Sequence, residues 1–264
     1  MTHQLRYREF APHPTLARYV ACYRLLQSAT PLNAERRVQV FPTGCVDLFF
    51  DCGDATSQIA GPARHVFVAT LHGQVDTIGV RFRPGAAHLF LHTSIDQFVA
   101  QDAQVADVWG TAGSSAEAQL QAAHSIAQRI TILDRLLLDQ LRFTRRVDHD
   151  VAHALALIEQ HGGTVVIDQL ARQIAISRRQ LERKFNTDMG LTPKQFARVV
   201  RLRHTIARLD RQHEHNLASL GAQSGFFDQA HFIHDFKQST GLTPRAYLRS
   251  RQDDAILQFN APQP

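Results

Sequence analysis

Two short segments in the last third of the chain carry side chains suited to reading nucleic-acid bases. The first, residues 178–183, is a predicted helix whose outer face bears three arginines and a glutamate. An arginine can donate two hydrogen bonds to a guanine edge, and a glutamate can accept one from cytosine. The second segment presents Gln229, Ala230, His231, Ile233 and His234. A glutamine can pair with adenine, and apolar side chains can contact the thymine methyl group.

The elements that must position these segments form an internal repeat. Gly-Leu-Thr-Pro occurs at residues 190–193 and again at residues 241–244. At the same offset Leu181 aligns with Phe232, Phe185 with Phe236, and Ser177 with Asp228. Each copy predicts a short helix, a turn, a second helix capped by the serine or aspartate, and a glycine that ends it. We call residues 167–193 the first unit and residues 217–244 the second unit.

Positive charge is concentrated where these units lie. Residues 149–251 contain 15 Lys and Arg against 9 Asp and Glu, whereas residues 1–148 contain 14 against 13. Such an excess is what a phosphate-binding surface requires. The alternative, that these helices merely have solvated faces, does not account for the duplicated motif.

Tandem helix–turn–helix units of this kind resemble the AraC/XylS family of bacterial transcription regulators. The resemblance covers roughly residues 151–249 and is carried by residues 177–185, 190–193, 225–232, 236–237 and 241–244, with Tyr247. It implies an all-α double helix–turn–helix domain that binds double-stranded promoter DNA and meets RNA polymerase. The family usually has glycine where this chain has Ala175. A left-handed backbone there would cost alanine about 1 kcal/mol.

The resemblance also implies roles for individual side chains. In the first unit Arg179, Glu182 and Arg183 contact bases, while Arg178 and Gln180 contact the DNA backbone. In the second unit the base-contacting candidates are Gln229, Ala230, His231, Ile233 and His234. Amides at a helix start attract anions, so further backbone contacts are expected where helices begin. These candidates are Thr192, Lys194, Lys237, Thr243 and Arg245.

One long helix, residues 194–209, is predicted between the units. It would span roughly 24 Å at about 1.5 Å per residue. Adding the helix radii separates the two reading helices by about 34 Å, one turn of B-DNA. A single chain could therefore reach two successive major grooves.

The N-terminal half predicts short strands followed by helices. The strands are residues 38–41, 46–51, 66–70 and 75–82, and the helices are residues 85–92, 95–99, 114–124 and 131–143. Residues 41–50 and 79–87 look like the N-terminal domain of one branch of the same family, which implies a β-rich, cupin-like sensor. The leucine-rich 131–143 helix either packs on its own domain or forms a homodimer interface.

The predicted fold is therefore α+β, in three parts. Residues 1–147 form the β-rich sensor domain with its helices, residues 148–251 form the DNA-binding domain, and residues 252–264 are a tail. Asp150 is predicted to cap a helix over residues 151–161.

Composition excludes several other classes. There is no apolar run of 18 residues and no signal-peptide pattern, and three cysteines fit a reducing cytoplasm. Cys45 and Cys52 are either buried thiols or redox sensors. His231 and His234, three positions apart, could hold a metal, but no cysteine or carboxylate completes a site, and a cupin metal triad is missing, so no metal, cofactor or catalytic residue is predicted.

The leading hypothesis is a one-component transcription regulator, of the activator type, whose N-terminal domain senses an unknown small-molecule or protein effector. One rival is a cupin-type enzyme that also binds DNA. Another is a module that binds a protein partner.

Overall fold

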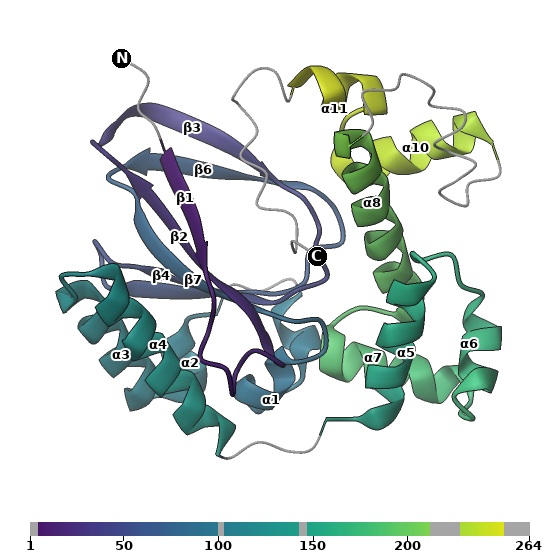
Figure 1. The fold of residues 1–264 in the computed structure, drawn as a ribbon, viewed down its shortest axis with the longest axis horizontal. Coiled ribbons are helices and arrows are strands. Elements are labelled where there is room, and N and C mark those ends of the chain that lie inside the picture. The colour runs from purple at the N-terminus through teal and green to yellow at the C-terminus, as the bar shows by residue number, and fades with distance from the viewer. Residues whose placement is uncertain (1–4, 100–102, 143–146, 212–227, 251–264) are drawn as a thin grey trace.

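The computed structural model describes residues 5–99, 103–142, 147–211 and 228–250. Strands dominate the described N-terminal part, residues 5–142, and the regular elements in the described residues of the C-terminal part, 147–211 and 228–250, are all helices (Figure 1). The predicted α+β fold class is confirmed. The predicted helix at residues 217–224, the turn at residues 225–227, Phe143 and the 252–264 tail lie outside the described residues.

Seven strands build two antiparallel sheets. Their bounds are β1 Leu5–Phe10, β2 Val20–Ser28, β3 Leu32–Val40, β4 Asp47–Asp51, β5 Thr56–Ala60, β6 Phe67–Gly73 and β7 Asp76–Phe82. The larger sheet has the order β1-β2-β7-β4-β5, and β3 pairs with β6 in the smaller one. All four predicted strands are present as β3, β4, β6 and β7, although β3 begins six residues before its predicted start.

Alternation along the strands gives the larger sheet one apolar and one polar face. Ile78 and Val80 of β7 are fully buried in the hydrophobic core, and Arg81 points to the opposite face. On that opposite face the Asp47 carboxylate forms an ion pair with Arg24 at 2.8 Å and another with Arg81 at 3.0 Å. Burial alone would raise the pKa of Asp47, but the two guanidinium groups outweigh it and lower that pKa.

Helices cover the apolar face of this sheet. They are α1 Ala87–Leu91, the 3₁₀ helix η1 Ile95–Phe98, α2 Val105–Trp109, α3 Thr111–Ala122 and α4 Ile126–Leu141. In α4, Leu133, Leu136 and Leu137 belong to the core of the N-terminal part. This helix begins five residues earlier than predicted because Ser125 caps it. Its leucines thus pack on their own part of the chain, and the homodimer interface remains a prediction.

Six helices make up the described C-terminal part. They are α5 His149–Gln160, α6 Ile167–Gln173, α7 Arg178–Met189, α8 Pro193–Arg211, α10 Gln229–Thr240 and α11 Pro244–Ser250. The predicted cap of α5 was wrong. Asp148, not Asp150, accepts from the amides of residues 150 and 151, because the helix begins two residues before the expected start. Among the described residues, no helix has the length and apolarity needed to cross a membrane.

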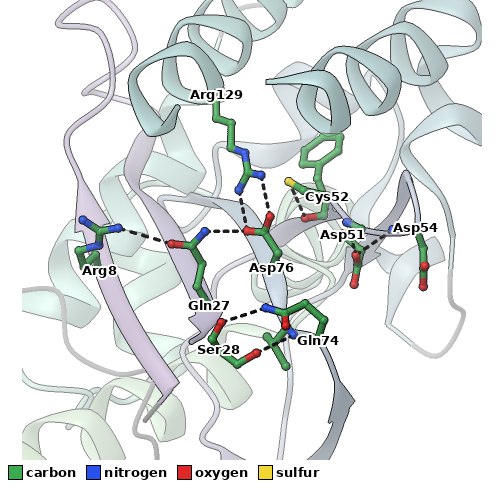
Figure 2. A network of polar contacts seen from close by, with 12 residues as sticks. Arg8, Gln27, Ser28, Asp51, Cys52, Asp54, Gln74, Asp76 and Arg129 are labelled. Atoms are coloured by element: carbon green, nitrogen blue, oxygen red, sulfur yellow. Dashed lines mark hydrogen bonds and ion pairs between the residues drawn. The ribbon is translucent and has the colours of Figure 1, made fainter. Parts of the chain in front are cut away.

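A polar network fixes α4 to the larger sheet at the start of its central strand, β7 (Figure 2). The two terminal nitrogens of Arg129 lie 2.6 and 2.7 Å from the two oxygens of Asp76 at the start of β7. Gln27 of β2 donates to the same carboxylate at 2.9 Å. Burial works against ionisation of Asp76, but these hydrogen bonds outweigh it and lower the pKa of Asp76.

We expect Arg129→Ala to lower the free energy of unfolding by about 1.5–3 kcal/mol near neutral pH, since it removes hydrogen bonds to a charged group. Because the pKa of Asp76 is lowered in the folded state, this stabilisation is present above the ordinary carboxyl pKa. It is lost as the pH falls through the folded-state value. Denaturant titrations at about pH 7 and about pH 3 should show the difference between variant and parent shrinking with acid.

Arg142→Ala is the matched control at the end of the same helix. Arg142 and Asp139 form an exposed surface pair, so the free energy of unfolding should change by no more than about 0.5 kcal/mol. An Arg129→Ala effect of equal size at both pH values would contradict the assignment.

Candidate nucleic-acid interface

Local sequence signals fold the first unit around α7. Ser177 accepts from the amide of Gln180 at 3.2 Å, and the Gln180 side chain accepts from the amide of Ser177 at 3.0 Å. This reciprocal pair satisfies two amides that the helix start leaves open. Leu181 and Phe185 are fully buried, which fixes the helix face that is turned outward. The predicted cap and inward residues of α7 are confirmed.

The outward face of α7 is open to solvent, and part of its charge is already paired. Arg178, Arg179 and Arg183 are exposed, and Glu182 is half-buried. The Nε of Arg178 lies 2.8 Å from Glu182, and Arg178 also approaches Asp168 of α6 at 3.4 Å. Glu182 must therefore release or share Arg178 before it can accept from a base. The i, i+4 spacing could have predicted this pair.

The turn of the first unit contains the left-handed alanine whose steric cost was considered from the sequence. Ala175 has φ 60°, in the left-handed region. The amide of Ile176 donates to the carbonyl of Ala171 at 3.1 Å, which closes the end of α6. A non-glycine residue is thus held in a conformation that glycine adopts without steric cost.

The described portion of the second unit repeats this construction. Asp228 caps α10 by accepting from the amide of His231 at 2.7 Å, and Phe232 and Phe236 are buried. The exposed candidates on this helix are Gln229, Ala230, His231 and His234. Ile233 is half-buried and packs against the core of this unit, so it borders the outward face.

The candidate phosphate contacts lie at helix starts and on exposed side chains. Lys194, Lys237 and Arg245 are exposed. Thr192 and Thr243 are occupied as caps, because each accepts from an amide three residues on at 3.2 Å. Their role toward DNA would therefore come from the helix start as a whole and not from a free hydroxyl group.

Lys184 is a cation of α7 that is paired within the chain. Its Nζ lies 2.7 Å from both Asp148 and Asp150 at the start of α5. These ion pairs anchor α7 to α5, a contact that the spacing of the residues did not suggest.

The connecting helix α8 is longer than predicted and forms ion pairs with α5 and α10. Its 19 residues span roughly 28 Å, and Figure 1 shows α5–α7 at one end and α10–α11 at the other. Arg203 of α8 pairs with Glu159 of α5 at 2.9 Å, and Arg201 pairs with Asp235 of α10 at 3.3 Å. The one-turn separation of the reading helices remains a prediction.

Comparison with known proteins supports this arrangement. A family model described as a helix-turn-helix domain matches residues 170–250, and one described as a domain of unknown function (DUF6597) matches residues 8–104. The HTH-type transcriptional activator RhaS of Salmonella schwarzengrund (strain CVM19633) is 28% identical over 174 residues. That match covers 63% of this chain, which spans 60% of the length of RhaS. Residues 170–250 therefore match a helix-turn-helix domain of the kind found in the transcription regulator RhaS.

Solved structures similar to this chain include two that match a minor part of it. A regulator with an AraC-type DNA-binding domain from Chromobacterium violaceum is 26% identical, with a TM-score of 0.36, and the match covers 39% of this chain and 91% of that one. A probable AraC family regulator from Rhodopseudomonas palustris CGA009 is 24% identical, with a TM-score of 0.35 and coverage of 39% and 97%.

Metal and thiol chemistry receive little support in the described part of the chain. No three His, Cys, Asp or Glu side chains in residues 5–99, 103–142, 147–211 and 228–250 are grouped to hold a metal ion. Burial raises the pKa of the Cys22 and Cys52 thiols to about 11, and it also raises the pKa of Cys45. Since the thiolate is the reactive form, these cysteines are poorly activated near neutral pH.

We expect Ala175→Gly to raise the free energy of unfolding of the chain by about 0.5–1 kcal/mol. The substitution removes the steric cost of a left-handed alanine, and the greater freedom of glycine in the unfolded chain offsets part of that gain. Denaturant titration gives the value. Ala207→Gly, at an exposed position inside α8, is the control and should cost about 0.5–1 kcal/mol. A loss of stability in both variants would contradict the account of the turn.

Proposed function

We propose that this chain is an AraC/XylS regulator, that it binds promoter DNA by placing α7 and α10 in successive major grooves, and that it activates transcription. The observation that carries the proposal is the matched construction of the two helices. Each is capped at its start, buried through an i, i+4 pair, and turned outward with polar side chains. The activating role is suggested by the RhaS relative, which is a transcriptional activator.

The proposal assigns base contacts to both outward faces. In α7 these are Arg179, Glu182 and Arg183, and in α10 they are Gln229, Ala230, His231, Ile233 and His234. The DNA backbone is contacted by Arg178, Gln180, Thr192, Lys194, Lys237, Thr243 and Arg245. Because charge is lower on α10, we expect the second unit to read its groove more weakly.

The proposal divides the chain into an effector-sensing domain, residues 1–147, and a DNA-binding domain, residues 148–251. It assigns RNA polymerase as a protein partner and gives the chain no catalytic role. A small-molecule effector is distinguished from a protein effector by thermal shift across a metabolite panel. Binding of a metabolite to the folded chain raises its melting temperature, whereas a silent panel favours a protein.

Selection of duplexes from a random library, followed by footprinting, tests the central claim. We expect an enriched DNA with two protected segments whose centres lie about 10 base pairs apart. Enrichment of no sequence, or protection of a single short segment, would refute reading by two helices.

We expect Arg183→Ala to weaken binding to the selected duplex by about 1–3 kcal/mol and to relax preference at one base pair. The reason is the loss of a two-bond contact to a base edge. Competition titrations with single-base variants of the duplex measure both effects. An equal loss on every sequence would mean that Arg183 contacts phosphate only.

A further inference from the structure

The hydrophobic core of the second unit contains a residue from the N-terminal part. Phe41, in the connection between β3 and β4, is 2% exposed and clusters with Leu202 and Ile206 of α8. Its ring meets Tyr247 of α11 edge-on, with centroids 5.9 Å apart, and Tyr247 in turn packs against Phe236 of α10. A fully buried aromatic ring is among the larger contributions that one side chain makes to a core.

A second connection of the N-terminal part reaches the same unit. Val66, just before β6, packs against this core, and its amide donates to the carbonyl of Ser239 at 3.0 Å. Its side chain also lies beside Gly241, which ends α10. The connections before β4 and before β6 thus both reach the second unit, and Val66 holds the end of α10.

A different set of contacts holds the first unit. Asn186 of α7 donates to Asp96 of η1 at 3.0 Å, and Ser94 donates to the carbonyl of Thr187 at 3.3 Å. Gly190 fits so closely that a β-carbon there would lie 3.1 Å from the carbonyl oxygen of Ile95. These contacts all lie at the C-terminal end of α7 and leave its outward-facing start exposed.

We propose that Phe41 and Asp96 are positioning residues, through which the N-terminal part sets the placement of α10 and α7 separately. This inference rests on the proposed function, since it concerns the helices that would read DNA. Neither residue lies on the outward face of α7 or α10. Phe41 acts through the core shared by α8, α10 and α11, and Asp96 acts through the end of α7, so losing one contact should impair one unit and spare the other.

The test uses the full-length chain and the best-enriched duplex from the random library, together with two derivatives in which one protected segment is scrambled. For Phe41→Ala we expect the apparent dissociation constant on the intact duplex to rise about tenfold, since the reading-competent placement of α10 becomes a minor population. Scrambling the α10 segment should then weaken binding little further, while scrambling the α7 segment should still weaken it strongly.

The double variant Ser94→Ala and Asp96→Ala should give the mirror pattern. Its apparent dissociation constant on the intact duplex should rise roughly fivefold, as expected for hydrogen bonds of about 1 kcal/mol. Scrambling the α7 segment should then weaken its binding less than it weakens binding by the parent. Phe67→Ala is the matched control, because that ring lies next to Val66 but is 47% exposed and lies outside the shared core. Equal loss of sensitivity to both segments in either test variant would overturn the proposal.

Hydrogen exchange of the DNA-free chain provides a readout that does not require DNA binding. In Phe41→Ala we expect amides of α10 and α11 to lose protection while the strands and α5–α7 keep theirs, with partial recovery in Phe41→Leu. Loss of protection throughout the chain, or no change in α10 and α11, would overturn the positioning role. Failure of the parent chain to select any DNA would refute the proposed function, while exchange would still decide this inference.

Discussion

The burial of apolar side chains four positions apart determines which face of each reading helix is available. Leu181 and Phe185 fix the rotation of α7, and Phe232 and Phe236 fix that of α10. A rotation of either helix about its axis would expose two large side chains, at about 1.5–3 kcal/mol each. Every polar residue of α7 and α10 that is assigned to DNA depends on this constraint, because its direction follows from what its helix buries.

Charge is arranged to complement this packing. Lys184 is held by two carboxylates against α5, and Arg178 is held by Glu182 and Asp168. Cations on the sides of α7 therefore stabilise the unit itself. Those at the centre of the outward face, Arg179 and Arg183, have no ion pair within the described part of the chain. An arginine without an internal ion pair can contact DNA without the energetic penalty of breaking one.

Features that depend on near neighbours in the sequence could be predicted from it. The caps Ser177 and Asp228, the inward residues of α7 and α10, and four of the strands follow from local rules and agree with the structure. The cap of α5 was misassigned because two aspartates stand two positions apart, and both satisfy the same rule. The pairings of Lys184 and of Phe41 could not be predicted, since each depends on how elements distant in the sequence pack together.

The shared core around Phe41 limits how this regulator could be recombined. A chimeric regulator is made by exchanging one domain for another at the linker between them. Here a cut near residue 148 would leave the second unit with a hole the size of a phenyl ring, next to Tyr247. A transplanted N-terminal part would have to bring an aromatic side chain of matching reach, so the two halves of this chain have to change together during evolution or engineering.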